Sequence, residues 1–201
     1  MEPRPDEQDL LERALAGDLA AFNALIEHYQ TAIFNLCLRM MRSTQSAEDA
    51  TQEAFISAFR NLQSFRGGSF QSWLYRIAGN ACYDELRRHK SRPAMHLDDA
   101  SGNPRFDPPT AEAAPDEQAQ QSELRRALQA ALGNLPDDQR LAIVLCDIQD
   151  MDYAEIAVVM KCSLGTVKSR ISRARSKLRT LLLAQGGELL PDRFRQGGGR
   201  Q

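Results

Sequence analysis

The residues best suited to chemistry are the cations and short hydroxyl side chains between Ile156 and Gly187. This stretch has seven Lys or Arg residues and no acidic residue. Cations attract phosphate groups, and the hydroxyls of Thr166, Ser169 and Ser172 can hydrogen-bond to the edges of bases. The composition is typical of a helix that enters the major groove of DNA. A solvated basic helix on an ordinary helical protein would show the same charge pattern.

Two short helices joined by a tight turn are expected to position these side chains. Asp152 can cap the first helix, and Glu155 three residues later completes a capping box. Ser163 is the candidate cap of the second helix, over 164–179. Apolar residues repeat at helical spacing: Tyr153, Ile156, Ala157 and Met160, then Leu164, Val167, Ile171, Ala174 and Leu178. The capped pair with a basic second helix predicts a DNA-binding helix-turn-helix.

A second group of polar residues lies on the helix expected from Ala47 to about Gln63, with Ser46 as its cap. Four residues share one face of this helix because they recur at helical spacing: Asp49, Gln52, Glu53 and Ile56. The expected core side is formed by Phe55, Ala58, Phe59 and Leu62. The acidic face fits either an ordinary solvated surface or a docking surface for a basic partner helix.

A third group follows a Gly-Gly loop at 64–69, on a helix expected from Phe70 to about Lys90. Its apolar side includes Trp73, which is assigned to the core. The opposite side carries Arg76, Asn80, Tyr83, Arg87 and Arg88. Cations interleaved with an aromatic ring and an amide suit phosphate contact and base stacking on single-stranded DNA. Solvated arginines around a packed tyrosine would give the same pattern.

The composition of the 201 residues fits a globular protein with a net charge of only −2. No apolar run approaches 18 residues, and the charged N-terminus lacks an apolar signal core, so a cytoplasmic protein is expected. Cys37, Cys82 and Cys146 fall in apolar helical patterns and are expected to be buried, reduced thiols. No metal site and no cofactor are expected.

The chain is expected to be all-α, with two small helical domains joined by a flexible linker. The first domain covers 8–90 and the second 122–184. The segment 91–121 is acidic and contains five prolines, which predicts a linker. The Gly-rich segment 185–201 is too short to fold alone and is expected to be a disordered tail.

Four segments together resemble the extracytoplasmic-function (ECF) group of sigma-70 family sigma factors. They are SAEDATQEAFISAFR at 46–60, FRGGSFQSWLYRIAGNACYDELRR at 65–88, LPDDQRLAIVLCDIQDMDYAEIA at 135–157 and GTVKSRISRARSKLR at 165–179. The resemblance covers about 18–90 and 122–182. It implies a transcription initiation factor that directs bacterial core RNA polymerase to promoters in response to a stress or another signal. It also implies an anti-sigma factor as a partner and no small-molecule substrate.

The resemblance also implies roles for individual residues. Contacts with the β′ clamp helices of the polymerase fall to Asp49, Gln52, Glu53 and Ile56. Recognition and melting of the −10 element fall to Phe65, Arg66, Gly67, Ser69, Arg76, Asn80, Tyr83, Arg87 and Arg88. Recognition of the −35 element falls to Thr166, Lys168, Ser169, Arg170, Arg173 and Lys177. The second domain is also expected to contact the β flap.

A different class of function is a repressor or activator that acts alone and whose N-terminal domain senses a ligand. A stand-alone helix-turn-helix regulator would bind its duplex site without polymerase, commonly as a dimer. An enzyme is not expected, because the sequence has no Gly-rich phosphate loop, metal-ligand cluster or nucleophile–base pairing.

Overall fold

The computed structural model describes residues 5–41, 43–91 and 115–184, and these residues form helices with no strand among them. The helices are α1 (Pro5–Leu15), α2 (Leu19–Met40), α3 (Thr44–Asn61), the 3-10 turn η1 (Leu62–Ser64), α4 (Phe70–Ser91), α5 (Pro115–Gly133), α6 (Asp137–Asp147), α7 (Tyr153–Met160) and α8 (Leu164–Ala184). The all-α prediction is confirmed. Within these ranges, no helix combines the length and apolar content that a membrane span requires.

Most of the predicted linker, 92–114, and the predicted tail, 185–201, lie outside the described residues. Helix α5 begins at Pro115, earlier than the start expected at Ser122. Proline is common in the first turn of a helix because its missing N–H group would have no intrahelical partner there.

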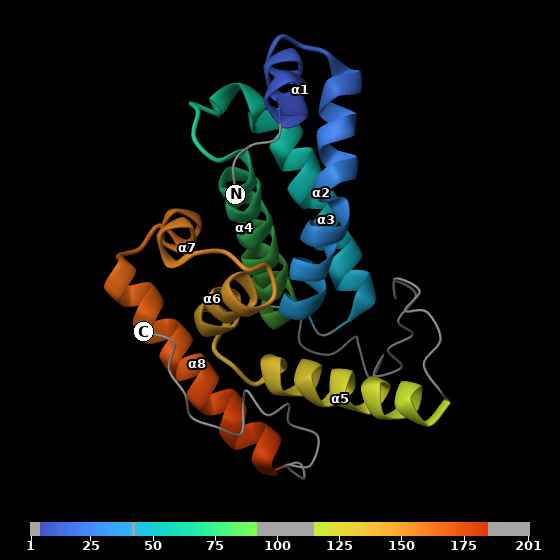
Figure 1. Ribbon diagram of the computed structural model, residues 1–201, viewed down its shortest axis with the longest axis vertical. Coiled ribbons are helices and arrows are strands. Elements are labelled where there is room, and N and C mark those ends of the chain that lie inside the picture. The colour runs from blue at the N-terminus through green and yellow to red at the C-terminus, as the bar shows by residue number, and fades with distance from the viewer. Residues whose placement is uncertain (1–4, 42, 92–114, 185–201) are drawn as a thin grey trace.

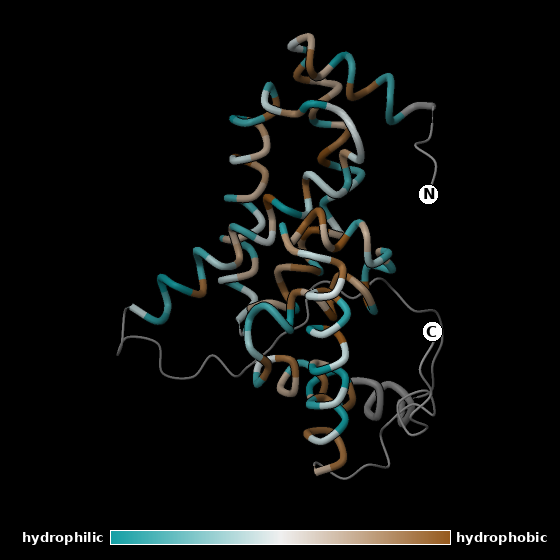
Figure 2. The backbone as a smooth tube through the Cα atoms, turned by 90° about the vertical axis from the view of Figure 1, so that its left-hand side faces the viewer, coloured by the Kyte–Doolittle hydropathy of each residue, from teal (hydrophilic) through white to brown (hydrophobic). Residues whose placement is uncertain are grey.

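Helices α1 to α4 form one group, in which α2, α3 and α4 pack side by side and α1 covers one end (Figure 1). Asp18 begins α2 by accepting hydrogen bonds from the backbone N–H groups of Ala20 and Ala21 at 2.9 and 3.2 Å. One side of α2 is apolar and buried, and Leu25, Ile33 and Leu36 have almost no exposed surface. Figure 2 shows the apolar turns of these helices facing inward.

The predicted start of α3 and the predicted burial of Phe59 need correction, whereas Ala58 and Leu62 are buried as predicted. Its cap is Ser43 rather than Ser46, since the Ser43 hydroxyl accepts the Ser46 N–H at 3.1 Å. The buried stripe is made of alanines (Ala47, Ala50, Ala54 and Ala58), while Phe59 is 51% exposed and lies against Phe22 at the bundle's edge. Small side chains let α3 lie close to its neighbours, and this closeness leaves no room for a phenylalanine.

Two of the four cysteines are fully buried in this group. The Sγ atoms of Cys37 and Cys82 lie 3.6 Å apart between α2 and α4 as free thiols. Cys146, on α6, is also a free thiol but only partly buried, so the prediction of full burial was wrong for it.

Helices α5 to α8 form the second group and contain the predicted helix-turn-helix. The capping box at the start of α7 is confirmed: the Asp152 carboxylate accepts the Glu155 N–H at 2.8 Å, and the Glu155 carboxylate accepts the Asp152 N–H at 3.0 Å. Lys161 ends α7 in the left-handed conformation, with φ 49°. The Ser163 hydroxyl then accepts the N–H of Thr166 at 3.1 Å, as a cap of α8 does.

The apolar stripe of α8 is buried at Val167, Ile171, Ala174 and Leu178. The prediction was wrong for Leu164, which is 45% exposed. This residue belongs to the first turn of α8, at the end of the helix farthest from α5 (Figure 1).

The two groups pack against each other. Helix α4 contacts α7, and α2 contacts α5 and α6. Gly79 on α4 permits a close approach, since a Cβ atom there would lie 3.2 Å from a Leu141 side-chain carbon on α6. Tyr75 donates a hydrogen bond to the side-chain oxygen of Gln149 at 2.7 Å, and Gln149 donates to the Ala32 carbonyl at 3.3 Å. The amide of Gln129 on α5 also bonds to carbonyls at the end of α2.

Arg140 on α6 joins the two groups from inside the core and is only 3% exposed. It donates hydrogen bonds to the carbonyls of Leu132, Gly133 and Leu135 at 2.8, 3.1 and 3.0 Å. A fourth bond reaches the carbonyl of Met40, at the end of α2, at 2.6 Å. Carbonyls at a helix C-terminus have no partner within the helix, so this one guanidinium satisfies the ends of both α5 and α2.

We expect Arg140→Leu to lower the free energy of unfolding by roughly 3 kcal/mol or more, because it leaves several buried carbonyls without donors. Urea denaturation followed by circular dichroism measures this loss. Arg173→Leu, at an exposed site on α8, is the matched control and should change stability by about 0.5 kcal/mol or less. Equal stability of the two variants would contradict the role assigned to Arg140.

Candidate nucleic-acid interface

Helix α8 presents a polar and basic surface opposite its buried stripe. Three of the predicted −35 contacts are exposed cations with no ion pair among the described residues: Lys168, Arg173 and Lys177. The hydroxyl of Ser169 donates to the Thr166 carbonyl at 2.9 Å and retains its oxygen as an acceptor. The exposed cations therefore form the part of α8 most available to phosphate groups.

Two other arginines of α8 are held by carboxylates of α6. Arg170 donates from Nε to Asp138 at 2.8 Å, and Arg175 donates from Nε and Nη2 to Asp147 at 3.2 and 2.5 Å. The hydrogen bonds with Asp147 raise the pKa of Arg175 above its ordinary value. These pairs orient α8 on α6, and Arg170 is committed to Asp138 rather than free for DNA.

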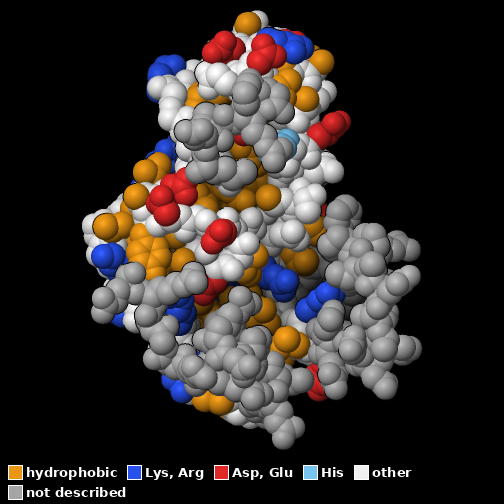
Figure 3. Space-filling view, in the orientation of Figure 1, with side chains coloured by type: hydrophobic (Ala, Val, Ile, Leu, Met, Phe, Trp, Pro, Cys, Tyr) orange, Lys and Arg blue, Asp and Glu red, His pale blue; other side chains and the backbone are white. Residues whose placement is uncertain are grey.

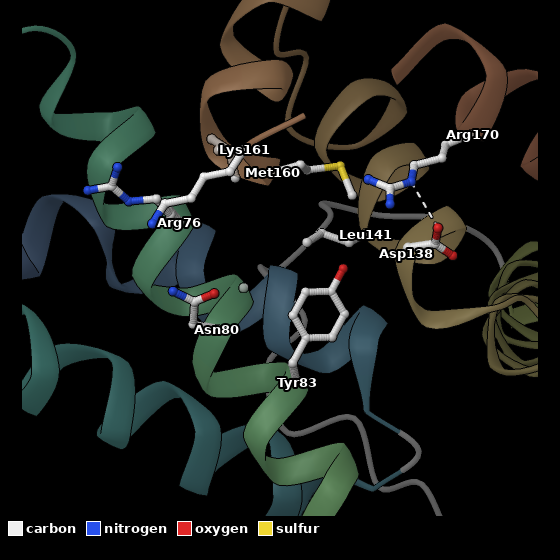
Figure 4. Close-up of a pocket in the computed structure, with 10 residues that line it drawn as sticks. Arg76, Asn80, Tyr83, Asp138, Leu141, Met160, Lys161 and Arg170 are labelled. Atoms are coloured by element: carbon white, nitrogen blue, oxygen red, sulfur yellow. Dashed lines mark hydrogen bonds and ion pairs between the residues drawn. The ribbon is translucent and has the colours of Figure 1, made fainter. Parts of the chain in front are cut away.

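The predicted −10 contacts on α4 face the second group of helices. Arg76, Asn80 and Tyr83 line a cavity of about 320 Å³ together with Asp138, Lys161 and Arg170 (Figure 4). Arg87 lies beside the next opening, with Tyr83, Asp137 and Asp138. Thus one seam brings together residues that the sequence assigned to two different DNA contacts. On the face drawn in Figure 3, Lys and Arg side chains (blue) form several small, separate groups.

Arg88 does not join the other predicted residues of α4 at this seam. It donates to Glu85 at 2.7 Å. His89 follows it on α4, with Nε2 lying 3.1 Å from Glu85 and 2.8 Å from the Ser46 hydroxyl. Glu85 therefore binds both Arg88 and His89, and His89 also contacts Ser46 of α3. Arg88 thus lies near a contact between α3 and α4 and does not line the cavity.

The loop before α4 divides into buried supports and an exposed tip. Phe65 is 8% exposed and meets the rings of Phe70 and Trp73 edge to face. The Ser69 hydroxyl accepts the N–H of Ser72 at 3.1 Å. Gly67, at the tip beside exposed Arg66, has φ 92°, a conformation that favours glycine. The tip is accessible, whereas Phe65 anchors the loop in the core.

The acidic face of α3 forms a separate surface. Asp49, Gln52, Glu53 and Ile56 are all exposed, as the helical spacing predicts. Two further apolar residues, Phe59 and Leu19, are 51% and 59% exposed in the same group of helices. Acidic, amide and apolar side chains on one helix can bind a partner helix through both ion pairs and apolar contact.

Comparison with known proteins gives consistent matches. Residues 25–92 match the family model described as Sigma-70 region 2, and residues 125–178 match Sigma-70, region 4. The ECF RNA polymerase sigma-E factor of Escherichia coli (strain K12) is 40% identical over 176 residues, covering 86% of this chain and 92% of that protein. The RNA polymerase sigma-H factor of Pseudomonas aeruginosa is 38% identical over 176 residues, covering 86% and 91%.

The chain belongs to the ECF group of the sigma-70 family of RNA polymerase sigma factors. A third relative, the ECF RNA polymerase sigma factor SigE of Mycolicibacterium smegmatis, is 38% identical, and the match spans 66% of its length. Among solved structures, CnrH in complex with the cytosolic domain of CnrY has a TM-score of 0.68 and 27% identity, covering 90% of this chain and 99% of that chain.

The two matched regions of this ECF sigma factor correspond to the two groups of helices. Region 2 covers most of α2 together with α3 and α4, and region 4 runs from α5 into α8. The seam described above is therefore the contact between region 2 and region 4.

Sequence reasoning did not single out two residues that shape this ECF sigma factor's seam. Asp138 pairs with Arg170 and lines both openings beside α4. Lys161 lines the cavity beside Arg76 although the two residues belong to different groups of helices. The acidic start of α6 and a cation in the helix-turn-helix turn were visible signals, but their proximity to α4 was not. Among the described residues, no cluster of three or more His, Cys, Asp or Glu side chains is placed to hold a metal ion.

We expect the phenol of Tyr83 to ionise late, because burial and then the charge of Asp138 raise its pKa to about 12. The unfolded chain has a tyrosine pKa near 10, so the folded state favours the protonated phenol. This contribution to stability is complete below about pH 10 and is lost as the pH rises toward 12.

Wild type should therefore lose more stability than Tyr83→Phe over this alkaline range, as thermal melts at successive pH values measure. The absorbance of tyrosinate at 295 nm gives an independent check. If the phenolate signal missing from Tyr83→Phe belongs to a group that titrates near pH 10, the burial argument is wrong.

Proposed function

We propose that this chain directs bacterial core RNA polymerase to specific promoters in the cytoplasm, in response to a stress or another signal. The observation that carries the proposal is that one chain exposes two surfaces of different character, each suited to a different partner. Helix α3 has an acidic and apolar face, and α8 has exposed cations in a capped helix-turn-helix. Duplex binding by a stand-alone regulator requires only the second surface.

The acidic face of α3 is proposed to dock on the β′ clamp helices of the polymerase. Asp49 and Glu53 supply charge, Gln52 supplies hydrogen bonds, and Ile56 supplies apolar contact area. Charge complementarity guides such encounters, while the apolar contact adds affinity. The second group of helices is proposed to contact the β flap as well.

The face of α4 and the loop tip are proposed to hold the opened strand of the −10 element. Arg76 and Arg87 suit phosphate contact, Asn80 suits hydrogen bonding, and Tyr83 suits stacking. Arg66, Gly67 and Ser69 lie in the loop and are proposed to contact the strand directly. Phe65 is proposed to act indirectly by anchoring the loop in the core, and Arg88 by its hydrogen bond to Glu85 on α4. Extruding a base costs a few kcal/mol, and contacts of this kind offset part of that cost.

Helix α8 is proposed to read the −35 element in the major groove. Lys168, Arg173 and Lys177 are exposed for phosphate contact. Thr166 and Ser169 lie near the start of the helix, which is the end that meets base edges in helix-turn-helix proteins. Arg170 can take part once it leaves Asp138. An anti-sigma factor is a proposed further partner, since CnrH was solved with a bound protein partner.

We expect Asp49→Ala with Glu53→Ala to weaken binding to core polymerase about tenfold, because both carboxylates leave the docking face. Fluorescence anisotropy of the labelled chain titrated with core polymerase measures the affinity. Asp9→Ala with Glu27→Ala removes two exposed carboxylates from α1 and α2 and is the matched control. Undiminished affinity of the α3 variant would refute the docking face.

We expect Arg173→Ala to weaken transcription from promoters that depend on the −35 element, because one phosphate contact is lost. In the polymerase-bound state, the slope of log affinity against log salt concentration should fall in magnitude by about 1. A promoter with a scrambled −35 element is the control, and the variant should match wild type there. An unchanged salt slope would remove Arg173 from the contacts.

Transcription in vitro with purified core polymerase tests the function as a whole. Added wild-type chain should produce promoter-specific transcripts, and core polymerase alone should not. A gel shift with and without core polymerase separates the two classes of regulator. Tight, specific duplex binding by the chain alone, without promoter-specific transcription, would favour a stand-alone regulator and overturn the proposal.

A further inference from the structure

Two buried thiols in the first group of helices lie in direct contact and take no part in the proposed interfaces. The Sγ atoms of Cys37 on α2 and Cys82 on α4 lie 3.6 Å apart, and both residues are free thiols with no exposed surface. Their helical neighbours Leu36, Met40 and Ala78 have no exposed surface either. A buried cysteine commonly serves as a small apolar packing residue, but two sulfur atoms in contact can also react with each other.

The two thiols are not equivalent. The Cys82 thiol donates a hydrogen bond to the Cys37 sulfur, and this bond lowers the pKa of Cys37. The same bond, and then burial, raises the pKa of Cys82. Because the thiolate is the nucleophile in thiol chemistry, Cys37 is the sulfur that reacts first with an oxidant, and Cys82 is placed to react second.

From this contact we propose that Cys37 and Cys82 form an oxidation site, at which hydrogen peroxide converts the two thiols into a disulfide that ties α2 to α4. The Cys37 thiolate attacks one peroxide oxygen and the O–O bond breaks, which gives a sulfenic acid and one molecule of water. The Cys82 sulfur then attacks the Cys37 sulfur, the S–O bond breaks, and the hydroxyl leaves with the Cys82 proton as a second molecule of water. The cysteines lose two electrons and two protons in all, and the peroxide is reduced to water.

The surroundings of the pair favour this internal bond. A disulfide brings its sulfur atoms to about 2.0 Å, so sulfurs that start at 3.6 Å need only a small approach, part of which side-chain rotation can supply. Neither thiol is exposed, so an oxidant must enter through a brief local opening of the bundle. Hydrogen peroxide needs a small opening, whereas the tripeptide glutathione needs a much larger one. The site therefore favours an internal disulfide over a mixed disulfide with glutathione.

The bond would enclose the parts of the chain that are proposed to bind polymerase and the −10 element. Cys37 and Cys82 are 45 positions apart, and the segment between them contains all of α3 and the loop 64–69. A disulfide that closes a long loop restricts the unfolded chain and so stabilises the folded one. The cytoplasm keeps thiols reduced, so the bond should form when peroxide accumulates and should hold these helices folded at that time. This consequence, unlike the bond itself, rests on the proposed function.

The test oxidises the full wild-type chain with hydrogen peroxide and maps the product by mass spectrometry of its unreduced peptides. We expect the peptides that contain Cys37 and Cys82 to be joined, with the loss of two hydrogen atoms. Thermal melts followed by circular dichroism should give a Tm roughly 5 °C higher for the oxidised chain than for the reduced chain. Dithiothreitol should reverse this shift.

The other two cysteines provide the matched control. Cys146 and Cys162 are partly buried, and their sulfurs lie 3.6 and 3.5 Å from arginines of α8. They are more exposed than the buried pair, so oxidation governed by exposure alone would modify them first. Cys146→Ala with Cys162→Ala should respond to peroxide as wild type does, whereas Cys82→Ala should lose both the linkage and the shift in Tm. The first of these variants leaves the buried pair intact, so it tests the proposal even if Cys82→Ala fails to fold.

The proposal is overturned if Cys37 and Cys82 remain unlinked after peroxide treatment, or if they are linked and the Tm stays the same or falls. Anisotropy with core polymerase, measured on the variant that keeps only the buried pair, separates this proposal from the proposed function. Absence of binding by the reduced chain rejects the proposed function but not the linkage. Binding that oxidation abolishes rejects the role of the linkage in preserving the polymerase-binding helices.

Discussion

The buried guanidinium of Arg140 is the contact on which the arrangement of the helices depends. It satisfies carbonyls at the ends of α5 and α2, and its Nη2 lies 3.5 Å from a carboxylate oxygen of Asp137. A buried charge is tolerated only where its hydrogen bonds are complete, so α6 can sit in one position relative to both helix ends. Because α7 and α8 pack on α6, their placement against α4 follows from the same contact.

In this arrangement, acidic and basic side chains lie on different parts of the surface. A chain with a net charge of only −2 can therefore still have a strongly basic surface on α8. The carboxylates of α6 lie where cations of α4 and α8 converge. Lys168, Arg173 and Lys177 are exposed on α8 and form no ion pair with any described residue. The acidic face of α3 belongs to a different surface.

Local signals predicted the helices well, because a cap or an apolar stripe involves residues only a few positions apart. Asp152 with Glu155 and Ser163 cap as expected. The errors arose where local signals were equivalent. Ser43 and Ser46 are both plausible caps, and Phe59 is as apolar as any core residue, so only the fit of α3 against α2 and α4 decided that alanines face inward.

The sequence by itself determined an all-α chain, the exposed acidic face of α3 and a basic α8, since charge and helical periodicity are local properties. The family was identified from the resemblance to ECF sigma factors, and the comparisons confirm it. Only the tertiary structure decided which of the candidate residues meet. Arg170 reaches Asp138 across 32 positions, and Lys90 reaches Asp137 across 47. Such pairs depend on the path of the whole chain, because an ion pair requires proximity in space and no spacing in the sequence specifies it.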